Sequence, residues 1–231
     1  MSGARIVTVD GPAGSGKSTL GRALARDLGL PIIDTGLFYR GIMVAADRAG
    51  ISPRDTAALG RLAEATVIAI PTDPWSDDDT VLVDGTPAGP ALRDPRNAPL
   101  LAAISSSAAV RAAVLEPQRA LAVHGAVAVG RDCGTVVFPD ATAKFYLDAP
   151  EAVRQQRRLA QLRARGAHAD DDTLRAEVGG RDRSDAARAV SPLRPAPGAY
   201  IIDTVAMDRT AMIDHALAIC ARAGLTAPDA L

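Results

Sequence analysis

The sequence predicts an α/β fold, a three-layer sandwich built around a five-stranded parallel sheet. Five short apolar segments occur along the 231 residues, and stretches with helical periodicity separate most of them. This is the pattern of a doubly wound sheet. A glycine-rich loop joins the first apolar segment to the first helical stretch. The length suits one domain of this kind with a small insertion.

The expected strands lie at residues 5–10, 31–34, 126–130, 143–148 and 199–203. The first helix follows the glycine-rich loop and carries Leu20, Leu24 and Leu28 on one face. Two further helices are expected at residues 36–49 and 55–65, and Asp55 is a suitable N-cap for the second. Residues 151–165 and 210–223 also have the periodicity of helices, and a short helix is expected at 173–181.

Residues 67–88 depart from the α/β alternation. The runs 67–70 and 81–83 are short and β-like, and a Pro- and Asp-rich segment separates them. With a turn at Asp84-Gly85, they predict a small antiparallel insert outside the main sheet. The helical stretch 93–123 contains Pro99 and Pro117, and we expect these prolines to divide it into at least two pieces.

The glycine-rich loop matches G-x-x-x-x-G-K-[ST] at Gly11, Gly16, Lys17 and Ser18. In a strand–loop–helix context, the loop amides and the helix N-terminus surround phosphate oxygens. Lys17 then reaches the β- and γ-phosphates, and the Ser18 hydroxyl ligates Mg²⁺. The chain has only two lysines, which makes a chance lysine here less credible. We therefore expect a nucleoside triphosphate on Gly11, Pro12, Ala13, Gly14, Ser15, Gly16, Lys17, Ser18 and Thr19.

Phosphoryl transfer needs cations around the reacting phosphates, and three arginine groups meet this need. Arg40 follows Tyr39, and Arg131 follows the expected strand 126–130, at the edge where open α/β sheets bind ligands. Arg181 and Arg188 flank Asp185 at nearly helical spacing, so they can share one face of a lid that closes over a charged substrate.

Composition narrows the class of partner. The formal net charge is −1, which argues against general binding of nucleic acid or membrane surfaces. Cys133 and Cys220 are far apart and are expected to be free thiols, and the three histidines lack the spacing of metal ligands. The first strand begins within a few residues of the N-terminus, so we expect no signal peptide. The prediction is a cytoplasmic monomer that binds small-molecule nucleotides.

Four motifs together resemble the bacterial cytidylate kinases, a family of P-loop nucleoside monophosphate kinases. In order they are Asp-Gly-Pro-Ala-Gly-Ser-Gly-Lys-Ser-Thr (10–19), Asp-Thr-Gly-Leu-Phe-Tyr-Arg (34–40), Gly-Arg-Asp-Cys-Gly-Thr-Val-Val-Phe-Pro (130–139) and Arg-Asp-x-x-Asp-x-x-Arg-x-x-x-Pro-Leu (181–193). The resemblance implies phosphorylation of CMP or dCMP by ATP with Mg²⁺. We expect a single domain with a core of 1–35, 105–166 and 195–225, an acceptor-binding insert of about 36–104 and an Arg-rich lid of about 167–194.

The resemblance also implies a role for each matching residue. Arg40, Arg131 and Arg188 would meet the acceptor phosphate, and Asp185 would meet the ribose with Arg181 and Tyr39. Asp132 and Arg111, with Thr35 nearby, would read the base, because a carboxylate and a guanidinium complement the amino, N3 and O2 edge of cytosine. Lys17, Arg131, Arg181 and Arg188 would be the catalytic cations.

Three departures from the family pattern leave alternatives open. Val129 stands where the family usually has an acidic residue, Ala102 stands where a serine helps to read the base, and Pro117 falls inside a helix. A kinase of the same architecture could therefore use UMP, a modified cytidylate or a small metabolite alcohol. A nucleotide-dependent switch or ATPase without an acceptor is the alternative from another class, but neither lysine lies in an N-K-x-D motif.

Overall fold

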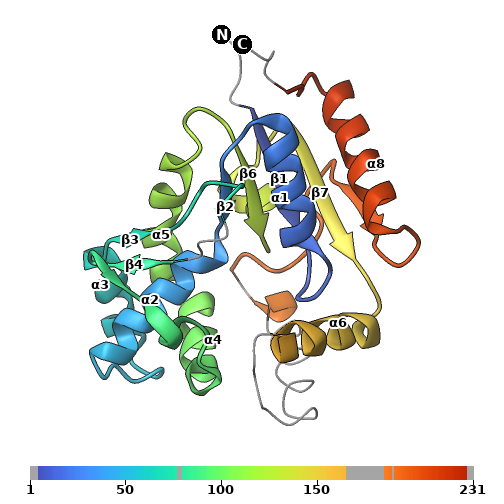
Figure 1. Cartoon of the computed structure of the whole chain (residues 1–231). Coiled ribbons are helices and arrows are strands. Elements are labelled where there is room, and N and C mark those ends of the chain that lie inside the picture. Colours follow the sequence, from blue (N-terminus) through green and yellow to red (C-terminus); the bar gives the residue numbers. More distant parts are fainter. Residues whose placement is uncertain (1–4, 77–79, 165–184, 189, 228–231) are drawn as a thin grey trace.

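The computed structural model describes residues 5–76, 80–164, 185–188 and 190–227. Its main sheet has five strands in the order β2-β6-β1-β7-β8, and all four neighbouring pairs are parallel (Figure 1). The strands are β1 (Ile6–Asp10), β2 (Ile32–Asp34), β6 (Ala126–Gly130), β7 (Ala143–Asp148) and β8 (Tyr200–Asp203). The structure thus confirms the predicted α/β class and places all five strands where the sequence predicts them.

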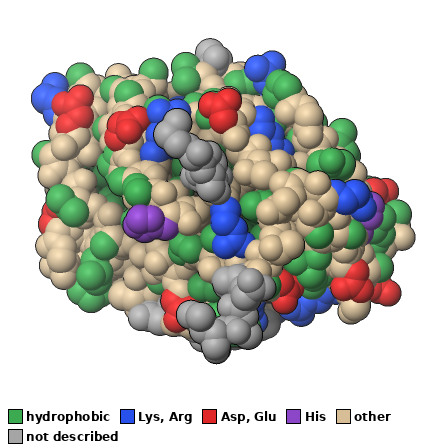
Figure 2. All heavy atoms as spheres, turned by 90° about the horizontal axis from the view of Figure 1, so that it is seen from above, with side chains coloured by type: hydrophobic (Ala, Val, Ile, Leu, Met, Phe, Trp, Pro, Cys, Tyr) green, Lys and Arg blue, Asp and Glu red, His purple; other side chains and the backbone are tan. Residues whose placement is uncertain are grey.

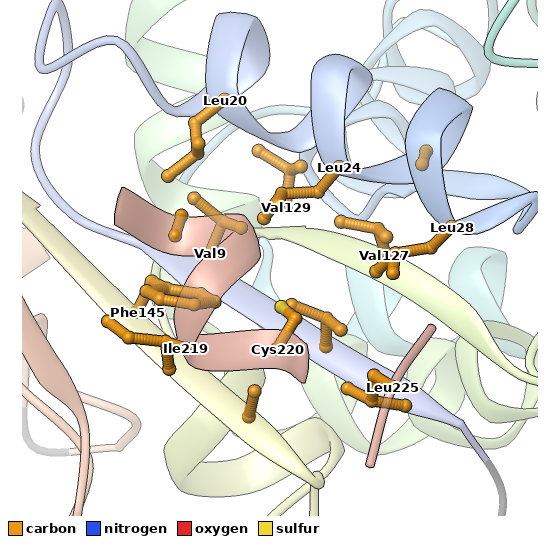
Figure 3. Close-up of a cluster of buried hydrophobic side chains, with 14 of the residues drawn as sticks. Val9, Leu20, Leu24, Leu28, Val127, Val129, Phe145, Ile219, Cys220 and Leu225 are labelled. Carbon is orange, nitrogen blue, oxygen red and sulfur yellow. The ribbon is translucent and has the colours of Figure 1, made fainter. Parts of the chain in front are cut away.

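Helices α1 (Lys17–Leu28) and α8 (Arg209–Arg222) cover one face of this sheet (Figure 3). Leu20 and Leu24 of α1 pack on Val9 and Val129 in a fully buried cluster. A Cβ atom at Gly21 would lie 2.4 Å from Val129 Cγ2, so glycine allows α1 to approach β6 closely. This packing fixes the start of α1 at the carboxyl edge of the sheet.

The opposite face is covered by the one-turn π-helix η3 (Cys133–Val137), and Leu115 of helix α5 (Ala108–Ala120) packs against the same side. Ile33 and Ala128 face this side and form a second buried cluster with Cys133 and Phe138. The sheet therefore lies between two layers, as in the predicted sandwich. Helix α6 (Glu151–Ala164) follows β7 and lies beside the phosphate-binding loop. The Arg154 guanidinium on this helix donates to the carbonyl of Ala13 at 3.1 Å.

The insert extends from the carboxyl edge of β2 and has its own hydrophobic cluster, which includes Phe38, Ile42, Leu59 and Ile104. Its small sheet confirms the predicted antiparallel unit, with the order β3-β4-β5. Strand β5 was not predicted, because a two-residue strand that contains a proline has no pattern of its own. The elements of the insert before α5 are α2 (Gly36–Arg48), α3 (Thr56–Ala65), β3 (Ile68–Ala69), β4 (Leu82–Val83), β5 (Thr86–Pro87), the 3₁₀ turns η1 (Gly89–Arg93) and η2 (Pro95–Asn97), and α4 (Ala98–Ser106).

The stretch 93–123 forms two helices, as predicted, but the prolines do not divide them. Pro99 lies in the first turn of α4, where a missing amide hydrogen costs little. Pro117 lies inside α5 and does not end it. The break falls at Ser107, whose extended backbone (φ −74°, ψ 121°) ends α4 and whose hydroxyl accepts from Val110 N to start α5.

Two other features concern the surface. On the face seen in Figure 2, basic and acidic side chains are interspersed and do not gather into a field of one sign. Within the ranges described above, no single helix is long and apolar enough to span a membrane; the bent pair Pro95–Ser106 and Ala108–Ala120 meets those limits only when its two parts are joined.

The expected helix 173–181 lies outside the described residues, as does most of the expected lid.

Candidate active site

The phosphate-binding loop connects β1 to α1 in a backbone conformation that requires glycine. Gly11, Gly14 and Gly16 have φ angles of 144°, 74° and 96°, which other residues rarely adopt. A Cβ atom at Gly14 would also lie 2.4 Å from the carbonyl oxygen of Arg154. Helix α1 begins after Gly16 without a side-chain cap. The first amide groups of α1 therefore have no capping side chain as an acceptor. Such amides bind anions, so the site fits a polyphosphate.

Lys17 and Ser18 present the two side chains that such a site needs. The Lys17 ammonium is buried and donates to the carbonyl oxygen of Pro12 at 2.5 Å, so it is held across the loop. Ser18 is exposed on the first turn of α1 and lines the cleft described below. A lysine in this place can contact phosphate oxygens, and a serine hydroxyl can ligate a metal ion that those oxygens also bind.

A single cleft of about 580 Å³ runs from this loop to the insert. Nine arginines and one lysine line it, against four aspartates. The cleft is therefore strongly positive, although the whole chain carries a formal charge of −1, and it favours ligands with several negative charges. Besides the predicted residues, the lining includes arginines that the sequence analysis did not single out: Arg22, Arg26, Arg93, Arg158 and Arg209.

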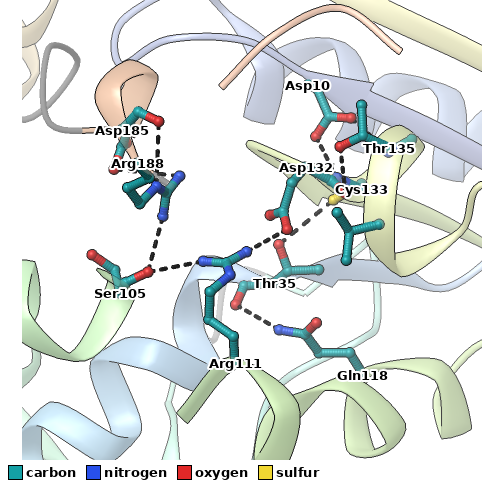
Figure 4. Close-up of polar contacts among 12 residues, drawn as sticks. Asp10, Thr35, Ser105, Arg111, Gln118, Asp132, Cys133, Thr135, Asp185 and Arg188 are labelled. Carbon is teal, nitrogen blue, oxygen red and sulfur yellow. Dashed lines mark hydrogen bonds and ion pairs between the residues drawn. The ribbon is translucent and has the colours of Figure 1, made fainter. Parts of the chain in front are cut away.

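At the insert end of the cleft, Arg111 and Asp132 form a buried ion pair (Figure 4). Their side chains are 7% and 5% exposed. Arg111 comes from α5, which packs on α3 of the insert, and Asp132 comes from the turn after β6, so the pair joins α5 to that turn. The guanidinium carbon of Arg111 also lies 5.1 Å from the centroid of the Tyr39 ring. Burial raises the pKa of Tyr39 to about 12, which keeps its hydroxyl neutral at physiological pH.

The backbone carbonyl of Ser105 is a contact that the sequence analysis missed. It accepts from Arg111 Nη1 at 3.0 Å and from Arg188 Nη1 at 3.1 Å (Figure 4). Ser105 is near the end of α4, because Ser107 breaks the helical stretch. Carbonyls at the end of a helix have no partner inside it, so the Ser105 carbonyl is available to the two arginines. The Ser107 N-cap was the available sequence signal. The break therefore exposes a carbonyl that holds two arginines of the cleft in place.

Asp185 connects Arg131 and Arg188, two of the nine arginines that line the cleft. Its Oδ2 accepts from Arg131 Nε at 3.0 Å, and its Oδ1 lies 3.5 Å from Arg188 Nη2. Within the described residues, the buried atoms Arg188 Nη2 and Arg111 Nε have no hydrogen-bond acceptor. Burial lowers the pKa of Arg188, although an arginine stays charged in proteins. Buried cationic donors without an acceptor indicate a site for an anion.

Asp10 fixes the turn that carries Arg131 and Asp132. Its carboxylate accepts from the backbone amides of Cys133 at 2.9 Å and Gly134 at 2.7 Å (Figure 4). Burial raises the pKa of Asp10 to about 6, and the hydrogen bonds from the two backbone amides lower it. The last residue of β1 thus connects the phosphate-binding loop to the turn after β6. Asp10 belongs to the motif at residues 10–19, but its role in this turn was not predicted from the sequence.

The structure brings most of the predicted site residues together. Fourteen line the one cleft: Ala13, Gly14, Gly16, Lys17, Ser18, Thr19, Thr35, Tyr39, Arg40, Arg111, Arg131, Asp132, Asp185 and Arg188. Gly11, Pro12 and Ser15 are buried in the loop and do not line the cleft. The Thr35 hydroxyl donates to the carbonyl of Val129 at 3.0 Å, and Arg40 donates to the carbonyl of Leu92 at 2.9 Å. Arg181 lies outside the described residues.

Comparisons with known proteins show which family the chain belongs to. The family model "Cytidylate kinase" matches residues 7–222. The cytidylate kinase of Mycobacterium avium (strain 104) is 42% identical over 217 residues, which cover 93% of this chain and 94% of that protein. The cytidylate kinase of Corynebacterium efficiens is 43% identical and covers 92% and 93% of the two chains, and that of Symbiobacterium thermophilum is 38% identical and covers 94% and 96%. The chain belongs to the cytidylate kinase family.

Proposed function

We propose that this protein transfers the γ-phosphoryl group of ATP to CMP or dCMP and forms ADP with CDP or dCDP. The observation that carries this proposal is one positive cleft with a phosphate-binding loop at one end and a buried Arg111–Asp132 pair at the other. Such a cleft can hold two nucleotides with their phosphates toward each other. In-line transfer needs this arrangement and little covalent help from the protein.

The donor half would be formed by residues 11–19. The loop amides and Lys17 would bind the β- and γ-phosphates and stabilise the negative charge that develops during transfer. The exposed Ser18 hydroxyl would bind Mg²⁺ together with the phosphate oxygens, and the ion would supply further charge neutralisation. The glycine-dependent loop and the uncapped start of α1 support this assignment.

The acceptor half would use the arginines near Asp185. Arg40, Arg131 and Arg188 would bind the acceptor phosphate, and the buried Nη2 of Arg188 makes no hydrogen bond with the described residues, although it lies 3.5 Å from Asp185 Oδ1. Asp185, with Arg181 and Tyr39, would contact the ribose. In the structure Asp185 holds Arg131 and lies beside Arg188, so it also orients the cations that meet the phosphate. Arg181 and Arg188 are the further catalytic cations of the proposal.

The base would be read by Asp132 and Arg111, with Thr35 nearby. Asp132 can accept from the exocyclic amine of cytosine, and Arg111 can donate to N3 or O2. Uracil presents a carbonyl and an N–H in place of the amine and N3, so it would leave buried groups unpaired at a cost of about 1–3 kcal/mol each. The burial of the ion pair supports this selectivity, because few waters can replace the lost contacts.

The domain division, partners and location complete the proposal. The core would comprise residues 1–35, 105–166 and 195–225, the acceptor-binding insert about 36–104, and the lid about 167–194. The separate hydrophobic cluster of the insert supports its role as a distinct wall of the cleft. We propose a cytoplasmic monomer that acts on small-molecule nucleotides and requires neither nucleic acid nor a membrane.

Another acceptor remains the alternative within the same architecture. Ala102 has an exposed methyl group where a hydroxyl would be needed to contact a base. The nearby Ser105 hydroxyl donates to the carbonyl of Ala102 at 3.2 Å, so it is engaged inside α4. UMP, a modified cytidylate or a small metabolite alcohol would then be phosphorylated in place of CMP.

The test is to identify the product formed from ATP and CMP. Purified protein with Mg²⁺ should convert both to ADP and CDP in equal amounts, and ADP formation without an acceptor should be much slower. Equal rates of ADP release with and without CMP, and no CDP, would instead identify an ATPase without an acceptor.

A further inference from the structure

Two carboxylates of the cleft form no ion pair with an arginine among the described residues. Four aspartates line the cleft. Asp132 is paired with Arg111, and Asp185 is paired with Arg131. The other two, Asp34 and Asp73, each accept one backbone amide through Oδ1, at 3.0 Å from Gly36 N and at 2.8 Å from Trp75 N.

The strand register places Asp34 on the face of the sheet that α1 covers. In the parallel pair β2–β6, Ile32 is opposite Val127 and Asp34 is opposite Val129. Paired residues of neighbouring parallel strands point to the same face, because side chains alternate along each strand in register. Val127 and Val129 lie in the cluster beneath α1 (Figure 3). Asp34 therefore faces the same layer as these valines.

Along that face, Asp34 and the first turn of α1 both lie toward the carboxyl edge of the sheet. A Cβ atom at Gly21 would lie 2.4 Å from Val129 and 3.8 Å from Ile32 Cδ1, so Gly21 marks where the helix crosses these strands. The first turn, with Lys17 and Ser18, is one turn nearer the carboxyl edge of the sheet, where β2 ends at Asp34. Asp34 and Ser18 line the same cleft.

A carboxylate at this position repels a polyphosphate unless a cation lies between them. Magnesium ions on nucleotides are commonly held by the loop Ser or Thr and by one aspartate at the end of a neighbouring strand. On this face the ends of β1 and β6 provide Val9 and Val129, which are buried and apolar. Among the described residues, no group of three His, Cys, Asp or Glu side chains could hold the ion without the nucleotide.

We propose that Asp34 is the carboxylate that positions the Mg²⁺ ion of bound ATP, together with Ser18. The proposal rests on the proposed function only in its use of ATP and not in the choice of acceptor. Asp34 acts as a positioning residue. Its contact with the Gly36 amide is made through Oδ1 and holds the side chain at the start of α2.

The test uses Asp34→Asn with Asp73→Asn as its matched control. Asparagine keeps the oxygen that accepts the Gly36 amide, so D34N removes charge and leaves this contact in place. D73N makes the same change at the other aspartate of the cleft that is not paired with an arginine. Mn²⁺ binding to each protein, saturated with a non-hydrolysable ATP analogue, is measured by electron paramagnetic resonance. If D34N does not fold, Asp34→Ser supplies an uncharged oxygen at the same place.

We expect D34N to weaken Mn²⁺ binding by about tenfold or more, the effect of losing a charge-assisted contact of about 1.4 kcal/mol. D73N should stay within about twofold of wild type, and metal-free binding of the analogue should not weaken in D34N. An unchanged Mn²⁺ affinity in D34N would overturn the proposal, and so would an equal loss in D73N. Since no acceptor is present, the result is independent of whether CMP is the substrate.

Discussion

Replacing Asp132 with asparagine is the sharpest test of base reading. The change keeps the size of the side chain and one acceptor oxygen, but it removes the charge that faces Arg111. Arg111 keeps its bond to the carbonyl of Ser105 at 3.0 Å and its contact with the Tyr39 ring. The guanidinium therefore remains oriented, and the main change is in what the acceptor base meets.

The structure sets the size of the effect. Removing one partner of a buried ion pair can cost about 3–5 kcal/mol when the other charge is left alone. Arg111 is not left alone here, so the loss should approach that of one charge-assisted hydrogen bond, about 1.5–3 kcal/mol. This corresponds to a decrease of about one to two orders of magnitude in kcat/KM for CMP. The equivalent removal of Arg111 should act in the same range. The KM for ATP should change little, because both residues lie at the insert end of the cleft.

A coupled assay of ADP release measures both constants in one experiment. Asp94→Asn is the matched control, because it breaks an ion pair with Arg96 in the same insert, where Arg96 is 88% exposed. Exposed pairs contribute little, so D94N should behave as wild type. If D132N keeps kcat/KM for CMP within about twofold of wild type while remaining folded, Asp132 does not read the base.

Three further predictions concern the rest of the cleft. Lys17→Ala should lower kcat by at least about two to three orders of magnitude without lowering the melting temperature, because it removes a cation from the reacting phosphates; near-normal kcat at saturating ATP would be incompatible with the assignment. Asp185→Asn should raise the KM for CMP about tenfold and the KM for ATP much less, because Arg131 and Arg188 lose their common partner; equal changes in both constants would indicate a general loss of structure. Burial raises the pKa of Asp10 from its ordinary value of 3.8 to about 6, so the folded protein binds this proton more tightly than the unfolded chain. This group therefore contributes stability at low pH that is lost as the pH rises through about 6. In urea unfolding, the free energy of wild type relative to Asp10→Asn should fall by about 2–3 kcal/mol between about pH 3.5 and pH 7, and a difference independent of pH would contradict it.

Local patterns were sufficient to predict the main sheet and the phosphate-binding loop. Buried parallel strands are short and apolar, and glycines at positive φ have few substitutes, so both leave strong traces in the sequence. The expected strand 199–203 differs from β8 by one residue at its start. The motifs at 34–40 and 130–139 also follow strands that end at one edge of the sheet, which explains why their residues meet in one cleft.

Tertiary contacts decided the features that could not be predicted. Pro117 removes one hydrogen bond near the end of α5, and packing of that helix on α3 outweighs the loss. The role of the Ser105 carbonyl depends on two arginines that are distant in the sequence, so no local pattern reveals it. The same is true of Asp10 and the amides of the turn after β6. The sequence places Asp34 in a motif but does not indicate which face of the sheet it occupies. That face follows from the register of β2 on β6.

Comparing acceptors tests the central claim most directly, that the cleft phosphorylates a cytosine nucleotide. Initial rates with ATP and Mg²⁺ should be measured for CMP, dCMP, UMP, AMP and GMP under identical conditions. We predict kcat/KM for CMP or dCMP at least about tenfold above that for UMP, because uracil leaves buried donors or acceptors unpaired beside Arg111 and Asp132. UMP or AMP used as efficiently as CMP would contradict the base-reading account, even though phosphoryl transfer itself would stand.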